Sequence, residues 1–568
     1  MTKSIFNKPI INVLLIVVLS IIAYANTFSV PFHYDDKFVI VNNPIIKDLG
    51  YFAEPSEAQK FTGWFEYTLF KYRYISYLSF ALNYRFHGLN PEGYHYVNLF
   101  IHICTALLLY SFIMLTFKTP FLRNTAVKAH ERHIALLAAL LFACHPLQTE
   151  AVTYIWQRVA SLSTLLYLLS LVMYIKFRLL SQNAGAKEPG PEQREKRSIL
   201  PGLVKALFYL ASLVSAVLAM KTKEIAFMLP VMLILYDLIF LKGPVRKRII
   251  YYIPFLFTML IIPLSLLGAE SHIWDLPKDI QEQFKMETPL STGEYLLAEF
   301  RVLVTYLRLV FLPVKQNFYY DYSRYSSFFD IEVLSSFVFL ASLLSLGLYI
   351  LFRYRDSFPH VRLISYGVLW FFVNLLIESS VITLNNVIYE HRMYLPSAGV
   401  FSALSIIVFM LMVRWKAYAR LITSLLVIII IVLTGATFAR NGVWKSEISL
   451  WSDVVSKSPS SLEARVNLGD AYRAAGLYSK AITEYEKVAE KTRSTSVYNN
   501  LGLAYQSAGQ IENALISYKL ATEVAPEDPQ AYSNIANIHM ARGETDKAIE
   551  LYQYAIRLNP NISELHAN

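Results

Sequence analysis

The stretch ARLITSLLVIIIIVLTGAT, residues 419–437, decides the fold class, because it has the length and composition of a helix that crosses a membrane. A bilayer core of about 30 Å requires about 20 apolar residues in an α-helix. The rest of the chain is similar: 55% of its 568 residues are hydrophobic and 17% are charged, whereas an average soluble protein has about 25% charged residues. The sequence therefore predicts an all-α protein whose main part is a multi-spanning membrane helix bundle.

Further apolar segments precede this stretch and bring the predicted number of spans to about eleven. They lie near residues 10–26, 97–117, 134–147, 150–175, 203–220, 225–241, 250–268, 333–352, 363–380 and 395–413. Segment 134–147 is short, but without it the basic loop 176–197 would lie on the opposite side from the other basic loops. The first segment has the flanks of a signal peptide but a weak cleavage site, so we treat it as a retained helix.

The net charge of +10 indicates membrane topology rather than nucleic-acid binding, because Lys and Arg cluster in the loops between apolar segments. With a cytoplasmic N-terminus, all of these basic loops are cytoplasmic: 118–132, 176–197, 242–248, 353–362 and 414–420. This orientation requires that segment 294–313 does not cross. Its Arg301 and Arg308 share one helical face, as in a helix that lies in the membrane interface. The C-terminus is then extracytoplasmic.

After Arg440 the composition changes and a repeat of 33 to 34 residues begins. Small residues recur at one position, alanines at a second and tyrosines at a third: Gly469, Gly502 and Ala536; Ala481, Ala514 and Ala548; Tyr485, Tyr518 and Tyr552. This is the tetratricopeptide pattern, in which small residues let paired helices approach and aromatic residues fill the space between repeats. We predict a membrane domain over 1–440, with outer loops 27–96 and 269–332. An extracytoplasmic solenoid follows over 441–568, with a partial repeat 446–460 and repeats 461–494, 495–528 and 529–562.

Four polar clusters lie on the extracytoplasmic side of this topology, although their positions were not used to derive it. They are Tyr34-Asp35-Asp36, the segment from His145 to Glu150, the segment from Lys221 through Lys223 to Glu224, and Tyr389-Glu390-His391-Arg392. Carboxylates can remove a proton and cations can bind phosphate, as group transfer from a phosphorylated donor requires. Arg158, one or two turns into its span, is an intramembrane charge that is costly unless it faces a cavity.

Each cluster also has a purely structural interpretation. Asp35 and Asp36 could be solvated or cap a helix, the lysines could anchor a helix at the membrane surface, and His145-Pro146 could mark a helix end. The cluster at 390–392 could be an interfacial salt bridge, and Arg158 could pair with a backbone carbonyl.

Other site chemistry has little support in the sequence. The chain has no nucleotide-binding, dinucleotide-binding or zinc-protease motif. Cys104 and Cys144 lie in apolar stretches, which argues against a disulfide framework. The adjacent acids could bind a divalent cation, but they lack a third ligand, so no metal site is predicted.

The chain resembles the transmembrane and tetratricopeptide repeat-containing proteins, viewed as protein O-mannosyltransferases with a GT-C glycosyltransferase fold. The resemblance covers nearly the whole chain, through short motifs that are specific only in combination. They include Tyr34-Asp35-Asp36 with Asn42-Asn43-Pro44, His87-Gly88-Leu89-Asn90-Pro91, His145-Pro146 with Thr149-Glu150, Lys223-Glu224, Tyr236-Asp237, Glu390-His391-Arg392-Met393-Tyr394-Leu395-Pro396 and Arg440-Asn441 with Trp444.

The resemblance implies an inverting transfer of mannose or another sugar from a polyprenyl-phosphate donor to a hydroxyl, usually of a protein Ser or Thr. Asp35 and Asp36 would be the catalytic acids, with Asp35 favoured as the base. Arg158, Lys223 and Arg392 would bind the donor phosphate, and His145, Glu150, Glu224, Glu390 and His391 would support the site. With about three full repeats the solenoid is shorter than in animal members. It suits a bacterial relative in the inner membrane, with periplasmic repeats, or lumenal repeats if the source is eukaryotic.

Two other functions remain open at this point. The sugar acceptor could be a glycan or a lipid headgroup, with the repeats recruiting a partner. Alternatively, the chain could be a membrane-anchored scaffold without catalysis, whose repeats bind a peptide or partner protein on their concave face. The scaffold explains the solenoid, but it does not explain why an anchor would carry so many spans and four polar clusters on one side.

Overall fold

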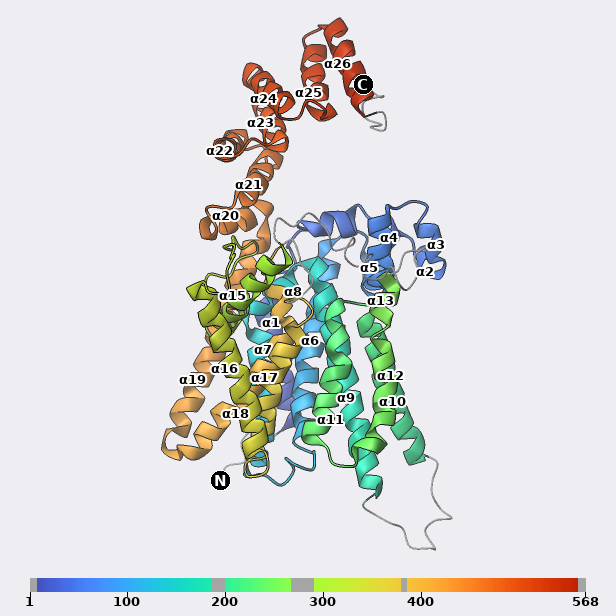
Figure 1. Ribbon diagram of the computed structural model, residues 1–568, viewed down its shortest axis with the longest axis vertical. Helices are drawn as coiled ribbons and strands as arrows, with labels where there is room; N and C mark the ends of the chain where they lie inside the picture. The colour runs from blue at the N-terminus through green and yellow to red at the C-terminus, as the bar shows by residue number, and fades with distance from the viewer. Residues whose placement is uncertain (1–7, 186–199, 267–290, 380–385, 560–568) are drawn as a thin grey trace. The chain divides into compact units, whose positions relative to one another are not determined.

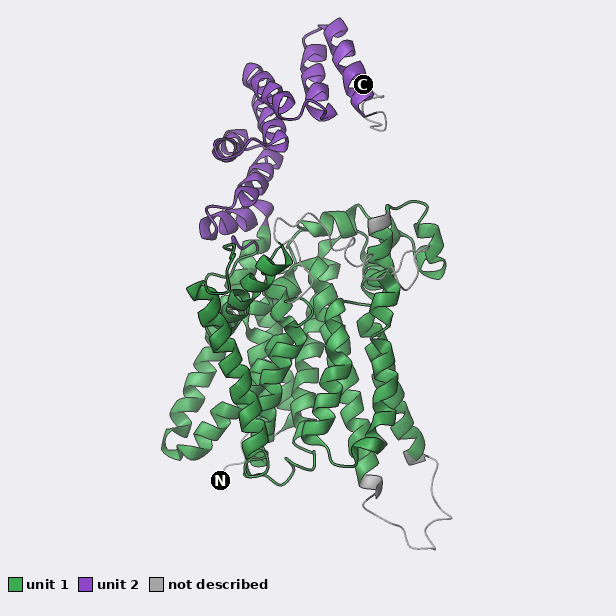
Figure 2. Ribbon diagram, viewed as in Figure 1, with its two compact units in different colours: residues 1–318, 322–445 green, residues 319–321, 446–568 purple. Residues whose placement is uncertain are grey.

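The computed structural model describes residues 8–185, 200–266, 291–379 and 386–559, and within these ranges it contains helices and no strands. The all-α prediction is thereby confirmed. The chain forms two compact units: residues 1–318 with 322–445, and residues 319–321 with 446–568 (Figure 2). We call them the membrane unit and the repeat unit. The second unit begins at Ser446, where the sequence analysis expected a boundary at 441.

Each predicted apolar segment is helical over most of its described residues, and these helices of the membrane unit run along a common direction (Figure 1). They are α1 (Pro9–Tyr24), α6 (Pro91–Thr116), α7 (Glu131–Cys144), α9 (Arg158–Gly185), α10 (Leu200–Met220), α11 (Leu229–Phe240), α12 (Val245–Thr258), α13 (Ile261–Leu266), α16 (Ile331–Tyr354), α17 (Val361–Leu375), α18 (Tyr394–Arg414) and α19 (Ala419–Asn441).

Among the described residues, 7 helices are long and apolar enough to cross a membrane, or up to 8 when the bent pair Ala126–Cys144 and Pro146–Thr153 counts as one span. Two of the remaining apolar helices, α1 and α17, have only 16 and 15 residues. Their apolar character agrees with burial in a membrane bundle, but their length is below that of a typical span. The multi-spanning class is therefore supported, whereas eleven crossings remain a prediction.

Several short helices lie together at one end of the membrane unit, which we call the α5 end (Figure 1). They are α2 (Gly50–Ala53), α3 (Pro55–Ala58), α4 (Trp64–Tyr72), α5 (Tyr74–His87) and α8 (Thr149–Thr153). The bend between α7 and α8 measures 53° and lies at His145-Pro146, because proline cannot continue the hydrogen-bond ladder of α7. At the end of α5, Gly88 has φ +56°, a conformation that favours glycine.

Helix α15 (Thr292–Phe311) occupies the segment that was predicted not to cross the membrane. A capping box between Ser291 and Glu294 fixes its first turn. It is not among the described helices that are long and apolar enough to span, and its place in the membrane interface stays a prediction. Residues 269–290 of the predicted outer loop 269–332 lie outside the described residues.

The repeat unit is a series of paired helices that begins with α20 (Glu447–Lys457). The pairs are α21 (Leu462–Ala474) with α22 (Tyr478–Ala489), α23 (Thr495–Ser507) with α24 (Ile511–Val524), and α25 (Pro529–Ala541) with α26 (Thr545–Leu558). A Cβ built on Gly502 would lie 2.4 Å from the Tyr518 ring, and one on Gly469 would lie 2.6 Å from the Tyr485 ring. The periodic glycines and tyrosines therefore make the close helix contacts that the sequence predicted.

Candidate functional site

Asp36 holds the loop after α1 in place. Its Oδ2 accepts a hydrogen bond from the backbone amide of His33 (2.9 Å), and its Oδ1 accepts one from the backbone amide of Trp156 (2.7 Å). The side chain is 1% exposed. Because both carboxylate oxygens are bonded to backbone donors in a buried position, Asp36 ties the loop to the segment before α9. This geometry favours a structural role for Asp36.

Asp35 lies beside this clamp but is only half-buried. Its backbone amide donates to the Tyr154 hydroxyl (3.0 Å). Burial raises the pKa of the Asp35 carboxyl above its ordinary value of 3.8, while the Tyr154 hydroxyl and the Arg73 guanidinium oppose this rise. A carboxylate with a raised pKa and access to solvent is suited to accept a proton.

Arg73 lies in the break between α4 and α5, where its backbone leaves the helical region. Its Nη2 donates to both carboxylate oxygens of Glu224, each at 3.2 Å, and the Tyr72 hydroxyl donates to the same carboxylate (2.8 Å). Burial opposes ionisation of Glu224, but the charges of Arg73 and Lys223 outweigh it and hold the pKa of Glu224 below its ordinary value.

The segment that contains Lys221, Lys223 and Glu224 is fixed against the start of α5. The backbone amide of Ile75 donates to the Lys221 carbonyl (3.0 Å), and the Ser76 hydroxyl donates to the Thr222 carbonyl (2.9 Å). These bonds bring the third predicted cluster to the Arg73 side of the unit. The Lys223 Nζ lies 2.8 Å from a Glu378 carboxylate oxygen, with both side chains 4% exposed.

The second and fourth predicted clusters are in direct contact. The Glu150 carboxylate lies 2.6 Å from the His391 Nδ1 and also accepts the His391 backbone amide (3.2 Å). Glu390 accepts hydrogen bonds from the Gln316 side chain (2.6 Å) and the Asn317 backbone amide (2.7 Å). All of these acids are buried. The pairing brings together segments that lie far apart in the sequence, as the topology predicted, but it leaves their charges largely satisfied by protein.

Arg392 is also enclosed by protein. Its Nη1 donates to the Val387 carbonyl (2.8 Å) and its Nη2 to the Asn386 carbonyl (3.0 Å), while Glu299 of α15 lies 3.7 Å from Nη1. The residue is 3% exposed. These contacts favour a role in holding the start of α18 rather than in binding a donor phosphate.

Arg158 joins three helices. Its Nε donates to the Asn98 side chain (2.6 Å), its Nη2 to the Asn83 side chain (2.7 Å) and the Tyr94 carbonyl (3.0 Å), and its Nη1 to the Ser79 carbonyl (3.2 Å). It is 0% exposed. The predicted phosphate contact has no support in this geometry, because the guanidinium is used to connect α5, α6 and α9. Pairing with backbone carbonyls, the structural alternative from the sequence, describes much of its environment.

His145 has both ring nitrogens engaged: Nδ1 accepts the Leu147 backbone amide (3.2 Å), and Nε2 donates to the Val310 carbonyl at the end of α15 (3.0 Å). It thus fixes the bend after α7. Among the described residues, no group of three or more His, Cys, Asp or Glu side chains could hold a metal ion. We therefore derive no step through the divalent cation that the sequence left open.

Three residues of this region were not predicted from the sequence: Arg73, Tyr154 and Glu378. Arg73 lies in a loop predicted to be extracytoplasmic, where basic residues depart from the positive-inside rule, but five other Lys and Arg residues of 27–96 share this signal and nothing local singles out Arg73. Glu378 could have been found as an acid near the end of an apolar segment. No sequence signal points to Tyr154, since its contact with Asp35 joins segments that are 119 residues apart.

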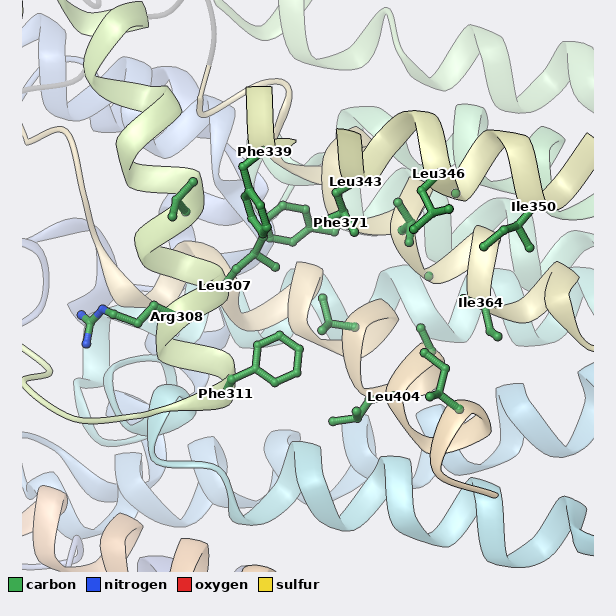
Figure 3. A pocket seen from close by; sticks show the side chains of 17 residues that line it. Leu307, Arg308, Phe311, Phe339, Leu343, Leu346, Ile350, Ile364, Phe371 and Leu404 are labelled. Atoms are coloured by element: carbon green, nitrogen blue, oxygen red, sulfur yellow. The ribbon is translucent and has the colours of Figure 1, made fainter. Parts of the chain in front are cut away.

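An apolar crevice of about 650 Å³ lies between α15, α16, α17 and α18 (Figure 3). Its lining is apolar apart from Arg308, whose guanidinium points away from the labelled apolar side chains in Figure 3. Helix α15 supplies Leu307 and Phe311 to the crevice. On another face of α15, the Tyr306 hydroxyl donates to the Tyr389 carbonyl (2.8 Å). One helix therefore connects the crevice with the polar clusters.

The fold and these clusters define a multi-pass helical membrane protein with tetratricopeptide repeats. Tetratricopeptide-repeat family models match residues 448–496, 495–528 and 529–562.

Curated relatives then confirm the predicted resemblance to the transmembrane and tetratricopeptide repeat-containing proteins. A protein O-mannosyl-transferase of Caenorhabditis elegans is 26% identical over 494 residues, which cover 84% of this chain and 62% of the relative. Protein O-mannosyl-transferase TMTC1 of Homo sapiens is 31% identical over 236 residues, 40% of this chain and 24% of the relative. TMTC2 of Homo sapiens is 34% identical over 165 residues, 28% of this chain and 18% of the relative. The chain thus spans less than two thirds of the length of these relatives.

Proposed function

We propose that the chain is a membrane glycosyltransferase that moves mannose or another sugar from a polyprenyl-phosphate donor to a protein Ser or Thr hydroxyl. The observation that carries this proposal is Asp35: a half-buried carboxylate with a raised pKa beside a guanidinium, in a chain similar to protein O-mannosyl-transferases. The proposed site lies on the extracytoplasmic side. In a bacterium this is the periplasmic face of the inner membrane, where the repeats also lie.

Asp35 acts as the general base in this proposal. Its carboxylate takes the proton of the acceptor hydroxyl while the hydroxyl oxygen forms a bond to the anomeric carbon of the sugar. The bond from the anomeric carbon to the phosphate oxygen breaks, and its electron pair leaves with the polyprenyl phosphate. Attack opposite the leaving group inverts the anomeric configuration. A cation beside the phosphate stabilises the negative charge of the leaving group.

The crevice between α15 and α18 suits the apolar chain of the donor. Its lining of leucine, isoleucine, valine and phenylalanine side chains resembles hydrocarbon, and its volume of about 650 Å³ can hold several isoprene units. Helix α15 also contacts Tyr389. The charges of Asp35 and Glu150 add to the effect of burial, which raises the pKa of the Tyr389 hydroxyl. The repeats would bind the acceptor protein.

The test is transfer by the purified protein in detergent or nanodiscs, with polyprenyl-phosphate mannose as donor and extracytoplasmic proteins of a deletion strain as acceptors. We expect mannosylated Ser and Thr residues, and we expect Asp35→Asn to lower the rate by about 10²- to 10⁴-fold, as loss of a general base does. If sugar is transferred only to glycans or lipids, the acceptor is a glycan or a lipid headgroup and not a protein. Absence of transfer with every donor and acceptor, together with partner capture by the repeats, would favour the scaffold.

A further inference from the structure

Arg73 differs from the other buried cations at the α5 end in how few of its donors are used. Only Nη2 donates to protein, to Glu224. The Nε atom is buried without a hydrogen-bond partner, and Nη1 has none among the described residues. The side chain is 17% exposed. An arginine can donate five hydrogen bonds, so most of the hydrogen-bonding capacity of this guanidinium is unused.

The three cations that the sequence nominated for phosphate binding are more deeply buried than Arg73, and each is held by protein groups. Arg158 donates to four protein oxygens at 0% exposure, and Arg392 donates to two backbone carbonyls at 3% exposure. Lys223 is paired with Glu378 at 2.8 Å. A phosphate would have to displace these buried bonds, and a buried donor that loses its partner costs about 1–3 kcal/mol.

The position of Arg73 relative to Asp35 follows from two contacts with one segment. The Arg73 guanidinium lies over the Trp156 ring, with Cζ 5.7 Å from the ring centroid. The Trp156 backbone amide is bonded to Asp36, and the hydroxyl of Tyr154 is bonded to the amide of Asp35. Residues 154–156 therefore lie between the two groups and hold them on one side of the unit.

We propose that Arg73 binds the phosphate of the lipid donor, and that Glu224 holds the guanidinium in place until the phosphate arrives. This inference rests on the proposed function and names the residue that its phosphate chemistry requires. Planar guanidinium groups bind phosphate through paired N–H donors. Here Nη1 has no partner in the described part of the chain and is the donor left for a phosphate oxygen, while the buried Nε is unpaired and reaches a second oxygen only after a movement of the side chain. Glu224 occupies only Nη2, so the carboxylate and the phosphate share the cation and compete for its charge.

The test measures binding of farnesyl monophosphate, a short isoprenoid phosphate, and of farnesol, its uncharged counterpart, to the full-length protein in nanodiscs. We expect Arg73→Gln to weaken binding of the phosphate about 10- to 100-fold, the value of a charged hydrogen bond, and to leave farnesol binding unchanged. Arg73→Lys should restore part of the affinity. Arg85→Gln is the matched control, because Arg85 is an exposed arginine on α5, the helix that begins directly after Arg73.

Glu224→Gln separates this proposal from a purely structural ion pair and stands even if Arg73→Gln does not fold. A competing carboxylate predicts that this variant binds farnesyl monophosphate about 3-fold tighter or better. The proposal is overturned if Glu224→Gln binds farnesyl monophosphate no more tightly than the wild type does. It is also overturned if Arg73→Gln loses affinity for farnesyl monophosphate and for farnesol to the same extent.

The base is tested independently: Asp35→Asn should still bind farnesyl monophosphate. Transfer that persists in Asp35→Asn would therefore contradict the base without affecting the phosphate site.

Discussion

Two regions beside α5 each bury an arginine, and they differ in how much of its hydrogen-bonding capacity the protein uses. Around Arg158, two asparagines and two carbonyls from α5 and α6 accept its donors. Around Arg73, only the Glu224 carboxylate among the described residues accepts hydrogen bonds, and they come from a single nitrogen, Nη2. The same contrast separates Asp36, bonded through both carboxylate oxygens, from half-buried Asp35. A charged side chain at the α5 end is therefore a candidate for ligand binding or catalysis only where the protein leaves some of its hydrogen-bonding groups without partners.

Replacing Arg158 should have the largest effect. Arg158→Leu leaves Asn83, Asn98 and two carbonyls without their donor, and each buried group that loses its partner costs about 1–3 kcal/mol. We expect little folded protein, or a markedly lower melting temperature in detergent, whereas Arg85→Leu should melt near the wild-type temperature. If Arg158→Leu is stable but no longer binds farnesyl monophosphate, Arg158 binds the donor phosphate, as the sequence predicted, and is not a structural residue.

Asp36→Asn should have a smaller structural effect. The asparagine keeps one acceptor, but its Nδ2 then faces a backbone N–H, so one buried amide loses its partner at a cost of about 1–3 kcal/mol. We expect lower thermal stability in Asp36→Asn and no loss in Asp35→Asn, measured by unfolding of both purified variants under the same conditions. Equal stability of the two variants would show that the Asp36 clamp contributes nothing.

The pH profile of transfer measures the interaction between Asp35 and Arg73. The base must be ionised, so kcat/KM should fall as the pH drops through the pKa of Asp35, which burial raises above 3.8. The Arg73 guanidinium lowers this pKa, so Arg73→Gln should move the acid limb to higher pH. Arg85→Gln should leave the limb unchanged. A limb that does not move in Arg73→Gln would argue that the two groups do not interact.

The last prediction concerns packing in the repeat unit. Gly502→Ala places a methyl group 2.4 Å from the Tyr518 ring, and overpacking of this kind typically costs about 1–3 kcal/mol. We expect the unfolding transition of the repeat unit to shift to lower temperature. Tyr518→Leu in the same chain should recover part of the loss by removing the clash. An unchanged transition in Gly502→Ala would mean that the helix pair relaxes without cost.

The sequence predicted the parts of the fold that local patterns encode. The apolar segment 419–437 became α19, and the repeat of glycine and tyrosine became close helix contacts such as Gly502 with Tyr518. His145-Pro146 marks a bend that local sequence predicts, because the proline ring prevents a continuous helix. The resemblance to protein O-mannosyl-transferases also came from short motifs, and the curated relatives confirm it.

The candidate site could be predicted only in part, because satisfaction of a charge depends on residues that are distant in the chain. The residues around Arg158 in the sequence do not show whether its side chain faces a cavity or the side chain of Asn98, which lies 60 residues away. Glu150 and His391 were grouped by sidedness, but their direct contact spans 241 residues. Arg73 was overlooked because its significance lies in donors that remain unused, and only tertiary structure shows which donors are used.

The measurement that tests the central claim most directly is sugar transfer by Asp35→Asn, made alongside its melting temperature and its binding of farnesyl monophosphate. We expect Asp35→Asn to keep a melting temperature and a phosphate affinity close to those of the wild type, with transfer lowered by about 10²-fold or more. Wild-type turnover in this folded, donor-binding variant would contradict Asp35 as the base.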